Sequence, residues 1–349
     1  MEQLDSDVPL PPGSLTVGIV YNVKKGLPSA IPDAEAEYDS IETVYSIKAA
    51  LETKGHDAIL LEADRALPEK LRTTRIDIAF NIAEGINGRG REAQVPAMLN
   101  FFGLPFTGSD ETTLCLTLDK ALTKRLLLSY GIRTPKYAVV SPSASLPPVS
   151  LRYPVIIKPN AEGSSKGISE QSIVESAAEL RAVAGRNIRL YRQCMLAEEY
   201  ISGREFTVGI LGNGAETKVF SPMEIKYKKA TQNGYRVYSY PVKQNYREFI
   251  DYQCPAALTS ELEAEMKVVA KEIYDILQCR DFARLDFRLD QDNTMYFLEI
   301  NPLPGLAPGY SDYPMLAEFC GVGYTELINR ILLAAIKRYS GEAEVRVRD

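Results

Sequence analysis

Polar side chains alternate with apolar ones in two short segments near the end of the chain, ARLDFRL and MYFLEIN, which are separated by DQDNT. This pattern predicts a β-hairpin. Because side chains alternate along a strand, Arg284 and Asp286 should share one face, and Glu299 and Asn301 should share a face for the same reason. If the strands pair, the carboxylates and the amide oxygen converge as hard ligands that suit Mg²⁺ or Mn²⁺. Arg284 beside them suits a phosphate or a developing oxyanion.

The positions between these polar residues are apolar and should face a core: Leu285, Phe287, Leu298 and Ile300. The segment that follows, NPLPGLAPGYSDYP, is a rigid turn and then a loop, and such loops position substrates on a scaffold. On these residues alone, a solvated hairpin face with ordinary salt pairing is an equally good interpretation.

A second set of residues suits phosphate binding. Lys158 ends the apolar segment YPVIIKPN and is followed by a loop of small residues at 163–167, whose backbone amides can approach phosphate oxygens. The loop is not a P-loop, because GxxxxGK[ST] is absent. Lys120, which follows Asp119 on the preceding helix, is a second candidate cation. The alternatives are a flexible turn and a solvated helix lysine.

The segment AEEYISGREFTV predicts a strand, a turn and a second strand. Residues 198–201 are placed to form an adenine-binding hinge through their backbone groups, and Glu205 is placed to hold ribose hydroxyls. Charged residues that are simply exposed at strand ends are the plainer interpretation.

Composition argues against several other classes of protein. The net charge of -6 and the pI near 5.2 do not favour a general nucleic-acid binder, and no apolar run is long enough for a membrane-spanning helix. Five dispersed cysteines without a CxxC pair predict free thiols in a cytoplasmic protein. The only histidine, His56, is predicted to lie at the surface in a helix-to-strand turn. The chemistry must therefore depend on carboxylates, Lys, Arg, backbone amides and a hard metal.

Alternating strands and helices predict an α/β (α+β) fold. The first strands are expected at 15–22, 57–63 and 76–82, and helices at 40–55, with Ser40 as candidate N-cap, and at 92–103. This alternation indicates a parallel sheet. A single helix at 117–131 precedes a smaller α+β unit. The expected division is a flexible leader at 1–14, an N-terminal α/β domain at 15–109, a central domain at 110–198, a C-terminal domain at 199–340 and a tail at 341–349.

The ordered set LDKALTK, IIKPNAEGSSKG, AEEYISGREFTV, ARLDFR and FLEINPLPG resembles the D-alanine–D-alanine ligase branch of the ATP-grasp superfamily. The resemblance covers roughly residues 15–338. It implies the ATP-grasp fold, with an N-terminal α/β domain, a central domain and a C-terminal domain, and with ATP between the last two. It also implies a magnesium-dependent enzyme that forms carbon–nitrogen bonds through an acyl phosphate, with release of ADP and phosphate.

The resemblance also implies roles for individual residues. By motif, the residues that would contact ATP are Lys120, Lys158, Glu162, Gly163, Ser164, Ser165, Gly167, Glu198, Glu199, Tyr200, Ile201 and Glu205. The implied metal ligands are Asp286, Glu299 and Asn301, and the implied catalytic residues are Arg284, Ser164 and Lys243, the last from a mobile loop.

The substrate end departs from the family pattern. The family's His-Gly and Gly-Glu-Asp-Gly loop is replaced by NIAEGINGRGREAQ, which carries Arg89 and Arg91; these arginines suit either an anion or structural pairing. The candidates for recognition of an amino group are Glu37, Asp39 and Ser40, but none of them aligns in register with the family's glutamate. The product carboxylate would meet Gly305 and either Tyr310 or, with one residue inserted, Ser311.

The sequence therefore predicts an ATP-dependent carboxylate–amine ligase whose partners are small amino-acid or carboxylate substrates, with neither nucleic acid nor membrane. A homodimer is implied only by the resemblance. Two alternatives stay open: a related biosynthetic ligase that joins a different carboxylate to an amino acid, and an ATP-binding protein without turnover.

Overall fold

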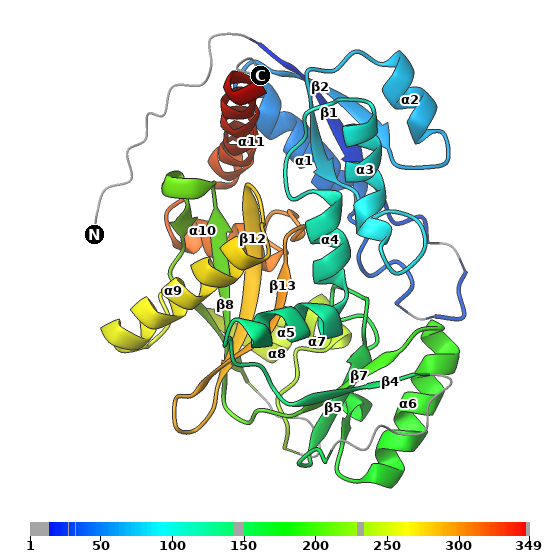
Figure 1. Cartoon of the computed structure of the whole chain (residues 1–349), viewed down its shortest axis with the longest axis vertical. Helices are drawn as coiled ribbons and strands as arrows, with labels where there is room; N and C mark the ends of the chain where they lie inside the picture. The colour runs from blue at the N-terminus through cyan, green and yellow to red at the C-terminus, as the bar shows by residue number, and fades with distance from the viewer. Residues whose placement is uncertain (1–13, 27, 32, 142–149, 229–233, 347–349) are drawn as a thin grey trace.

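The computed structural model describes residues 14–346, except for residues 27, 32, 142–149 and 229–233. Its three β-sheets follow one another along the chain (Figure 1). Apart from Ser14, the predicted leader lies outside the described residues, as do residues 347–349 of the predicted tail. The last helix, α11 (Tyr324–Arg346), continues into the segment that was expected to be a tail.

The first sheet is parallel, as predicted, and has the strand order β2–β1–β3. Its strands are β1 (Thr16–Tyr21), β2 (Asp57–Glu62) and β3 (Ile78–Ile82). Its helices are α1 (Ile41–Glu52), α2 (Leu67–Thr73) and α3 (Gln94–Phe101), the last preceded by the 3₁₀ turn η1 (Arg91–Ala93). Val44 and Ile47 of α1 share a buried core with Ile328 and Ile331 of α11. The last helix therefore packs against the first unit of the chain (Figure 1).

The second sheet is antiparallel and has the order β4–β7–β5–β6. Its strands are β4 (Tyr137–Val140), β5 (Val155–Pro159), β6 (Ile173–Val174) and β7 (Met195–Glu199). Helix α6 (Ala177–Tyr191) packs on this sheet through Leu180 and Ala184. Helices α4 (Glu111–Leu118) and α5 (Lys120–Ser129) link it to the first sheet.

The third sheet has six strands in the order β11–β10–β8–β12–β13, with β9 paired to β8. Its strands are β8 (Arg204–Leu211), β9 (Lys218–Val219), β10 (Met223–Tyr227), β11 (Ile250–Gln253), β12 (Phe282–Leu289) and β13 (Met295–Asn301). The remaining helices are α7 (Tyr240–Gln244), α8 (Tyr246–Phe249), α9 (Ser260–Ile276) and α10 (Asp312–Phe319). The domain boundaries near residues 110 and 199 stay a prediction.

The helix expected at 117–131 is two helices, α4 and α5, which meet at Asp119. Asp119 has extended backbone angles, and its carboxylate accepts a hydrogen bond from the Leu122 amide at 3.0 Å. An aspartate in this position caps a new helix instead of continuing the old one. The break places Lys120 in the first turn of α5.

The prediction that His56 lies at the surface was wrong, because only 5% of the residue is exposed. The backbone that leads into β1 covers the turn, and the Leu15 amide donates a hydrogen bond to His56 Nδ1 at 3.3 Å. Burial lowers the pKa of His56. The five cysteines are free thiols, as predicted, and none forms a disulfide.

Within the described residues, no single helix is both long and apolar enough to cross a membrane. Helices α10 and α11 meet that criterion only when they are counted together across a bend of 105°.

A buried carboxylate, that of Asp281, joins three parts of the molecule. Asp281, which precedes β12 and is fully buried, accepts hydrogen bonds from the Gly108 amide at 2.7 Å and from Asn213 Nδ2 at 2.7 Å. Arg338 of α11 completes its shell with an ion pair of 2.9 Å. These contacts tie the first unit, the third sheet and the last helix to one side chain.

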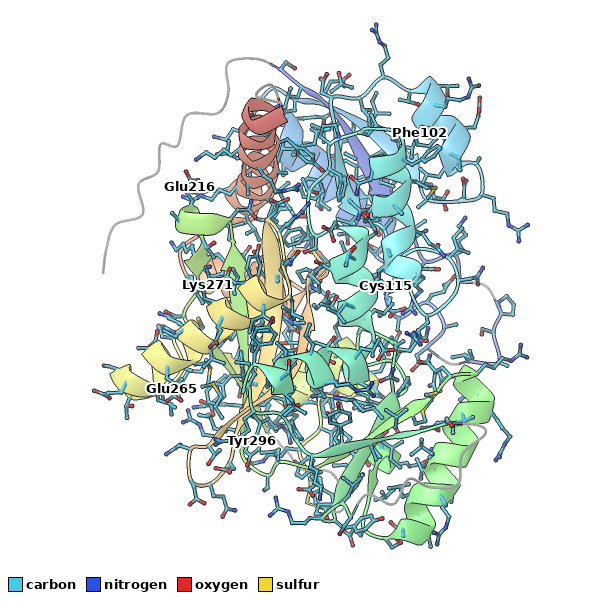
Figure 2. The ribbon with its side chains drawn as sticks, in the orientation of Figure 1. Phe102, Cys115, Glu216, Glu265, Lys271 and Tyr296 are labelled. Carbon is cyan, nitrogen blue, oxygen red and sulfur yellow. The ribbon has the colours of Figure 1, made fainter. Side chains whose placement is uncertain are left out.

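We predict that Asp281→Asn lowers the free energy of unfolding by about 3–5 kcal/mol, because it leaves the Arg338 guanidinium buried without a counter-charge. Denaturant-induced unfolding measures the change. The matched control is Asp275→Asn, which breaks the exposed ion pair with Lys271 on α9 (Figure 2) and should cost less than about 1 kcal/mol. Equal losses in both variants would contradict this role of Asp281.

Candidate active site

The β12–β13 hairpin forms as predicted. In its register Arg284 lies opposite Asn301, and Asp286 lies opposite Glu299. The four polar side chains therefore converge on one face of the third sheet. Asn301 Oδ1 also accepts a hydrogen bond from the Leu303 amide at 2.9 Å, which fixes the start of the following turn.

A β-bulge interrupts the alternation that the sequence suggested. The register shifts between Asp286 and Phe287, so that Phe287 pairs with Phe297 and Leu298 is the extra residue. The prediction that Leu298 faces the core was wrong: it is half-buried and lines the same cleft as Glu299, while Phe297 takes the buried position. Because of the bulge, the strand register places Glu299 opposite Asp286.

The pKa values of the two hairpin carboxylates are shifted in opposite directions. Burial raises the pKa of Asp286 to about 6, although the Arg284 guanidinium, 2.9 Å away, opposes the rise. Burial also disfavours the charge of Glu299, but the positive charges of Lys120 and Lys158 outweigh it and hold its pKa at about 2. Lys120 Nζ lies 3.4 Å from Glu299 Oε2. Glu299 is therefore ionised at neutral pH without a metal.

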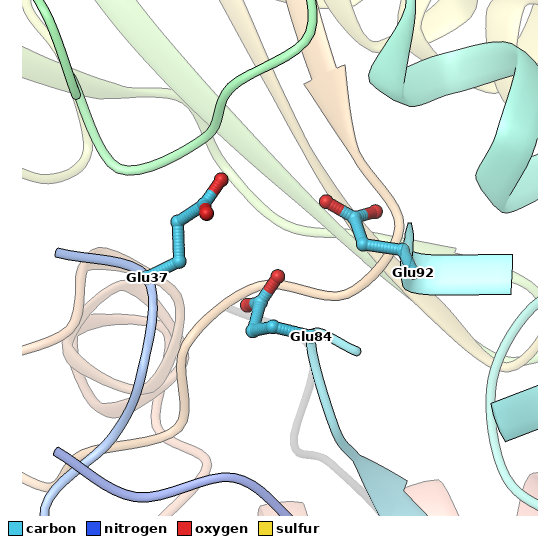
Figure 3. A group of neighbouring side chains, drawn as sticks. All are labelled: Glu37, Glu84 and Glu92. Atoms are coloured by element: carbon cyan, nitrogen blue, oxygen red, sulfur yellow. The ribbon is translucent and has the colours of Figure 1, made fainter. Parts of the chain in front are cut away.

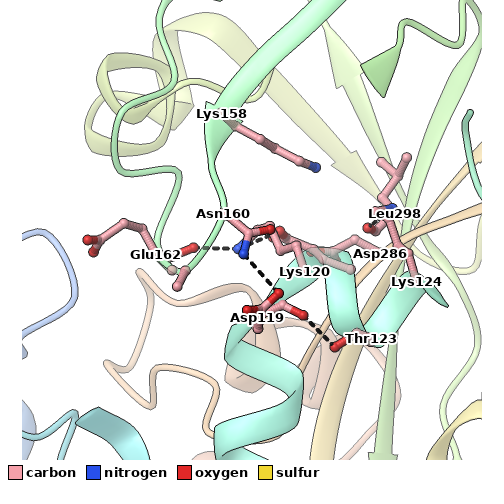
Figure 4. A network of polar contacts seen from close by, with 12 residues as sticks. Asp119, Lys120, Thr123, Lys124, Lys158, Asn160, Glu162, Asp286 and Leu298 are labelled. Carbon is pink, nitrogen blue, oxygen red and sulfur yellow. Dashed lines mark hydrogen bonds and ion pairs between the residues drawn. The ribbon is translucent and has the colours of Figure 1, made fainter. Parts of the chain in front are cut away.

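Two lysines, Lys124 and Lys158, share one buried carboxylate, that of Glu198. Figure 4 shows the two lysines beside Asp286 and Leu298. Glu198 Oε2 lies 2.6 Å from Lys158 Nζ, and its Oε1 lies 2.8 Å from Lys124 Nζ. Lys124 also donates to the carbonyl of Leu298 at 2.6 Å. Burial lowers the pKa of Lys124 to about 8, against the favourable charge of Glu198. Lys124 was not predicted as a site residue; its spacing of one helical turn from Lys120 was the available signal.

The predicted hinge is built from β7 and the turn after it. The Glu199 carboxylate pairs with Arg152 at 3.0 Å, and the Tyr200 amide donates to the carbonyl of Pro154 at 2.9 Å. The Ile201 amide, in contrast, donates to none of the residues that the structure describes. Ile201 lines the cleft, so that this amide is available to an acceptor on a ligand.

Glu205 on β8 also lines this cleft, and an arginine that the sequence analysis missed holds it in place. Arg288 donates two hydrogen bonds to Glu205 Oε2, the shorter of 2.6 Å, and one to the carbonyl of Ile201 at 2.8 Å. Its guanidinium also lies 4.8 Å from the centre of the Tyr200 ring. Arg288 thus fixes the hinge against β12. No sequence motif distinguished it from a solvent-facing strand residue.

Side chains of the first unit hold the predicted phosphate loop, residues 163–167, in place. The Gly163 amide donates to Glu37 Oε1 at 2.5 Å, and the Gly167 amide donates to Asp33 Oδ2 at 2.6 Å. Ser164 and Ser165 have positive φ angles of 50° and 56°, and among the described residues their amides have no hydrogen-bond acceptor. These two amides are therefore the ones that a phosphate can use.

The cleft between the second and third sheets brings the predicted residues together around a cavity of about 90 Å³. The second sheet contributes Lys158, Glu198 and the hinge, and the third contributes Glu205, Arg284, Asp286 and Glu299. Lys243 of α7 also lines it, and its Nζ donates to Ser164 Oγ at 3.4 Å. Burial lowers the pKa of Lys243. A smaller adjoining cavity, which shares Ser164 and Glu299, adds Lys120, Glu162, Gly163 and Asn301.

Some of the substrate-end candidates are already engaged within the protein, and others are not. Arg91 is buried, donates to the carbonyl of Ala161 at 3.0 Å and pairs with both Glu37 and Glu162. Ser40 is exposed, at the N-cap position of α1, without a capping hydrogen bond. Asp39 makes no side-chain hydrogen bond to another described residue, and burial raises its pKa to about 6.

A larger cavity of about 760 Å³ lies beside residues 160–162 and is lined by Arg89 and Arg91. The Arg89 side chain is 69% exposed and pairs with Asp119 at 3.3 Å. This cavity contains neither of the hairpin carboxylates and is separate from the cleft.

The turn after β13 supports Arg284. Ser311 Oγ accepts a hydrogen bond from the Ala307 amide at 3.2 Å, and a Cβ on Gly305 would lie 2.8 Å from that oxygen. Asp312, which the sequence analysis did not identify, pairs with Arg284 at 3.3 Å and accepts hydrogen bonds from Tyr252 at 2.6 Å and from Tyr238 at 3.0 Å. Tyr310 is half-buried in the same turn.

The parallel N-terminal sheet, followed by two sheets with a charged cleft between them, defines the ATP-grasp class. The family model described as D-ala D-ala ligase C-terminus matches residues 126–333. The chain belongs to the D-alanine–D-alanine ligase family.

Relatives and solved structures agree with this assignment. A D-alanine–D-alanine ligase of Bordetella petrii is 34% identical over 87% of this chain and 90% of its own length. The uncharacterized protein y4sG of Sinorhizobium fredii is 35% identical over 85% of this chain and 88% of its own. A crystal structure of D-alanine–D-alanine ligase from Bacillus anthracis, complexed with ATP, superposes with a TM-score of 0.74 at 22% identity, covering 94% of this chain and all of that one.

We predict that Gly167→Ala disorders the phosphate loop. Gly167 has a φ of 75°, and a Cβ there would lie 2.5 Å from Pro159 Cγ, so the loop must move. Hydrogen exchange at residues 163–168 should rise at least about tenfold, which corresponds to about 1.4 kcal/mol of local opening. In the control, Gly185→Ala within α6, the new Cβ meets only the flexible end of Arg189 at 3.7 Å, and stability should rise by about 0.5–1 kcal/mol. Unchanged exchange in Gly167→Ala would show that the loop does not need this glycine.

Proposed function

We propose that this chain uses ATP to activate a carboxylate as an acyl phosphate and joins it to an amine, forming a peptide bond with release of ADP and phosphate. One observation carries the proposal. In a member of this ligase family, Lys158 and Arg284 meet two carboxylates, Asp286 and Glu299, in one cleft, and Lys120 meets Glu299 in the adjoining cavity. This combination suits a triphosphate with a hard metal ion.

ATP would bind with its base at the hinge and its phosphates at the loop. The free amide of Ile201 is the donor for the base edge, and Glu205, fixed by Arg288, is the acceptor for the ribose hydroxyls. The phosphates would meet the amides of Ser164 and Ser165 together with the ammonium groups of Lys120 and Lys158. Backbone amides and point charges are the usual donors to phosphate oxygens.

A divalent cation fits the hairpin. Asp286 and Glu299 are paired strand neighbours with oxygen ligands, and Glu299 is ionised already. With the Asn301 amide they would hold Mg²⁺ or Mn²⁺. When bound, the ion supplies charge neutralisation at the phosphates.

The protein groups would act by position and charge. The donor carboxylate attacks the γ-phosphorus and ADP leaves; the lysines balance the charge on the phosphates. The amine then attacks the acyl carbon, and Arg284, held by Asp286 and Asp312, stabilises the oxyanion of the tetrahedral intermediate. Collapse of that intermediate expels phosphate. Lys243 and Ser164 close the cleft from the loop side and exclude water.

Glu299→Gln tests the metal assignment. It keeps the shape of the side chain but removes the charge, and the rate of ADP release with saturating substrates should fall at least about 100-fold. The control is Asp292→Asn, an exposed carboxylate in the turn of the same hairpin, which should leave the rate unchanged. If Glu299→Gln kept full activity, the metal assignment would fail.

Removal of divalent cations with a chelator should abolish turnover, and Mg²⁺ or Mn²⁺ should restore it, because the phosphate charge is otherwise incompletely neutralised. The measurement is ADP release before and after each addition. Full activity in chelator would contradict the proposal.

A second candidate function is ligation of a carboxylate other than D-alanine. It is favoured by the loop at residues 84–92, where Arg91 pairs with Glu37 and the side chains of Glu84 and Glu92 make no hydrogen bond or ion pair with a described residue (Figure 3). ADP release across a panel of D- and L-amino acids separates the candidates: activity with D-alanine alone, with the dipeptide as product, eliminates the second. ATP binding without phosphate release on any pair of substrates would instead indicate a protein without turnover.

A further inference from the structure

Two of the five free cysteines lie side by side at the edge of the third sheet. Cys254 directly follows β11, which is the edge strand, and Cys320 directly follows α10. Their Sγ atoms are 3.8 Å apart, although 66 positions separate the two residues in the chain. No other pair of cysteines among the described residues is in hydrogen-bond contact. The fold therefore brings these two thiols together from distant segments.

A small reagent can reach this pair of thiols from solvent. Each of the two cysteines is half-buried, and their chain neighbours Pro255, Phe319 and Gly321 are exposed. Reactive cysteines lie in partly exposed and electropositive surroundings, whereas a thiol that is enclosed by an apolar core is inert. The position of the pair thus meets the first of these conditions.

The two thiols differ in acidity. The hydrogen bond from Cys254 lowers the pKa of Cys320 to about 7, although burial opposes this change. The Ser221 amide and the ammonium groups of Lys218 and Lys267 act in the same direction as that hydrogen bond. In Cys254, the hydrogen bond to Cys320 and burial both raise the pKa. Because the thiolate is the nucleophile in thiol chemistry, Cys320 is the attacking sulfur of the pair.

The surroundings of the pair do not suit a metal ion. A structural zinc site needs four ligands, usually cysteines and histidines. Within the described part of the chain, no third cysteine, histidine or carboxylate clusters with Cys254 and Cys320. Lys218 and Lys267 would also repel a cation. The chemistry that fits two adjacent thiols here is therefore oxidation.

The two segments that carry the cysteines also meet at Asp312. This residue begins α10, at whose other end Cys320 lies, and its carboxylate pairs with Arg284 at 3.3 Å. Tyr252 of β11, two residues before Cys254, donates a hydrogen bond to the same carboxylate at 2.6 Å. A disulfide holds its sulfur atoms about 2.05 Å apart. Its formation would therefore pull α10 relative to β11 and strain the contacts of Asp312.

We propose that Cys254 and Cys320 form a reversible disulfide by exchange with a small disulfide such as oxidised glutathione, and that this bond lowers turnover by pulling Asp312 away from Arg284. Formation of the bond does not depend on the proposed ligase function, whereas its effect on turnover rests on that function.

The exchange takes two steps. The Cys320 thiolate attacks one sulfur of the small disulfide, and the other sulfur leaves as a thiolate. The Cys254 thiol then loses its proton to the first released thiolate and attacks Cys320 Sγ, which expels the second small thiolate. One small disulfide is thereby reduced to two thiols, and the two protein thiols are oxidised to one disulfide.

Peptide mapping tests the bond itself. The full chain is incubated with oxidised glutathione, its remaining thiols are alkylated, and it is digested without reduction. The wild-type protein should yield a linked pair of peptides that contain Cys254 and Cys320, and dithiothreitol should separate them. Cys254→Ser should keep glutathione on Cys320, because the resolving thiol is missing. In Cys320→Ser, Cys254 should be modified at least about threefold more slowly than Cys320 is in Cys254→Ser. Absence of the linked pair, or faster modification of Cys254, would overturn the inference.

The effect on turnover is measured as kcat for ADP release. Oxidation should lower kcat of the wild-type protein at least about fivefold, because Arg284 loses its position, and dithiothreitol should restore it. Cys320→Ser should keep its kcat under the same treatment. The matched control is Cys115→Ser, an exposed thiol on α4 (Figure 2), which should lose activity as the wild-type protein does. A cross-linked protein with unchanged kcat would contradict the inference.

Failure of the ligase function would be visible separately. If the reduced wild-type protein releases no ADP with any pair of substrates, the proposed function fails. Peptide mapping still decides the bond, and hydrogen exchange then decides its effect on Asp312. Exchange at residues 312–320 should differ at least about threefold between the reduced and the cross-linked protein. Equal exchange in the two forms would show that the bond does not move α10 and would overturn the inference.

Discussion

The cleft brings lysine and arginine side chains next to a similar number of carboxylates, and its construction depends on the carboxylates that hold those cations in place. Lys158 and Lys124 would repel each other near the same point without Glu198 between them. Arg288 is fixed by Glu205 in the same way. Buried pairs of this kind add little net stability, because desolvation offsets attraction, but loss of one partner is strongly destabilising. The arrangement therefore fixes the geometry of the cations before a ligand arrives, which is what electrostatic catalysis requires.

Carboxylates also join the first unit to the phosphate loop after the second sheet's strand β5. Glu37 belongs to the first unit, yet its carboxylate accepts the Gly163 amide of the phosphate loop and pairs with Arg91. Asp33 holds Gly167 at the other end of that loop. Movement of the first unit relative to the second sheet would thus disturb the amides proposed for phosphate. The first unit and the proposed phosphate-binding amides are thus physically connected through this loop.

Local patterns in the sequence were sufficient for the hairpin, the parallel first sheet and the small-residue loop, because alternation and glycine content act over a few residues. They were not sufficient where a side chain is explained by a distant partner. Lys124 looks like an ordinary helix lysine until β7 places Glu198 against it, and Arg288 looks solvent-facing until β8 brings Glu205 opposite. Leu298 was misplaced because a single bulge reverses the alternation. The burial of His56 was not predicted because the chain before β1 covers its turn.

The central claim is that a carboxylate is activated by transfer of phosphate to one of its oxygens. Its most direct measurement is the fate of ¹⁸O supplied in the donor carboxylate, followed by mass spectrometry of the released phosphate during turnover with ATP and an amine. The account predicts that one labelled oxygen appears in each inorganic phosphate, since the oxygen that attacks the γ-phosphorus leaves with it. Turnover that yields unlabelled phosphate would contradict the account.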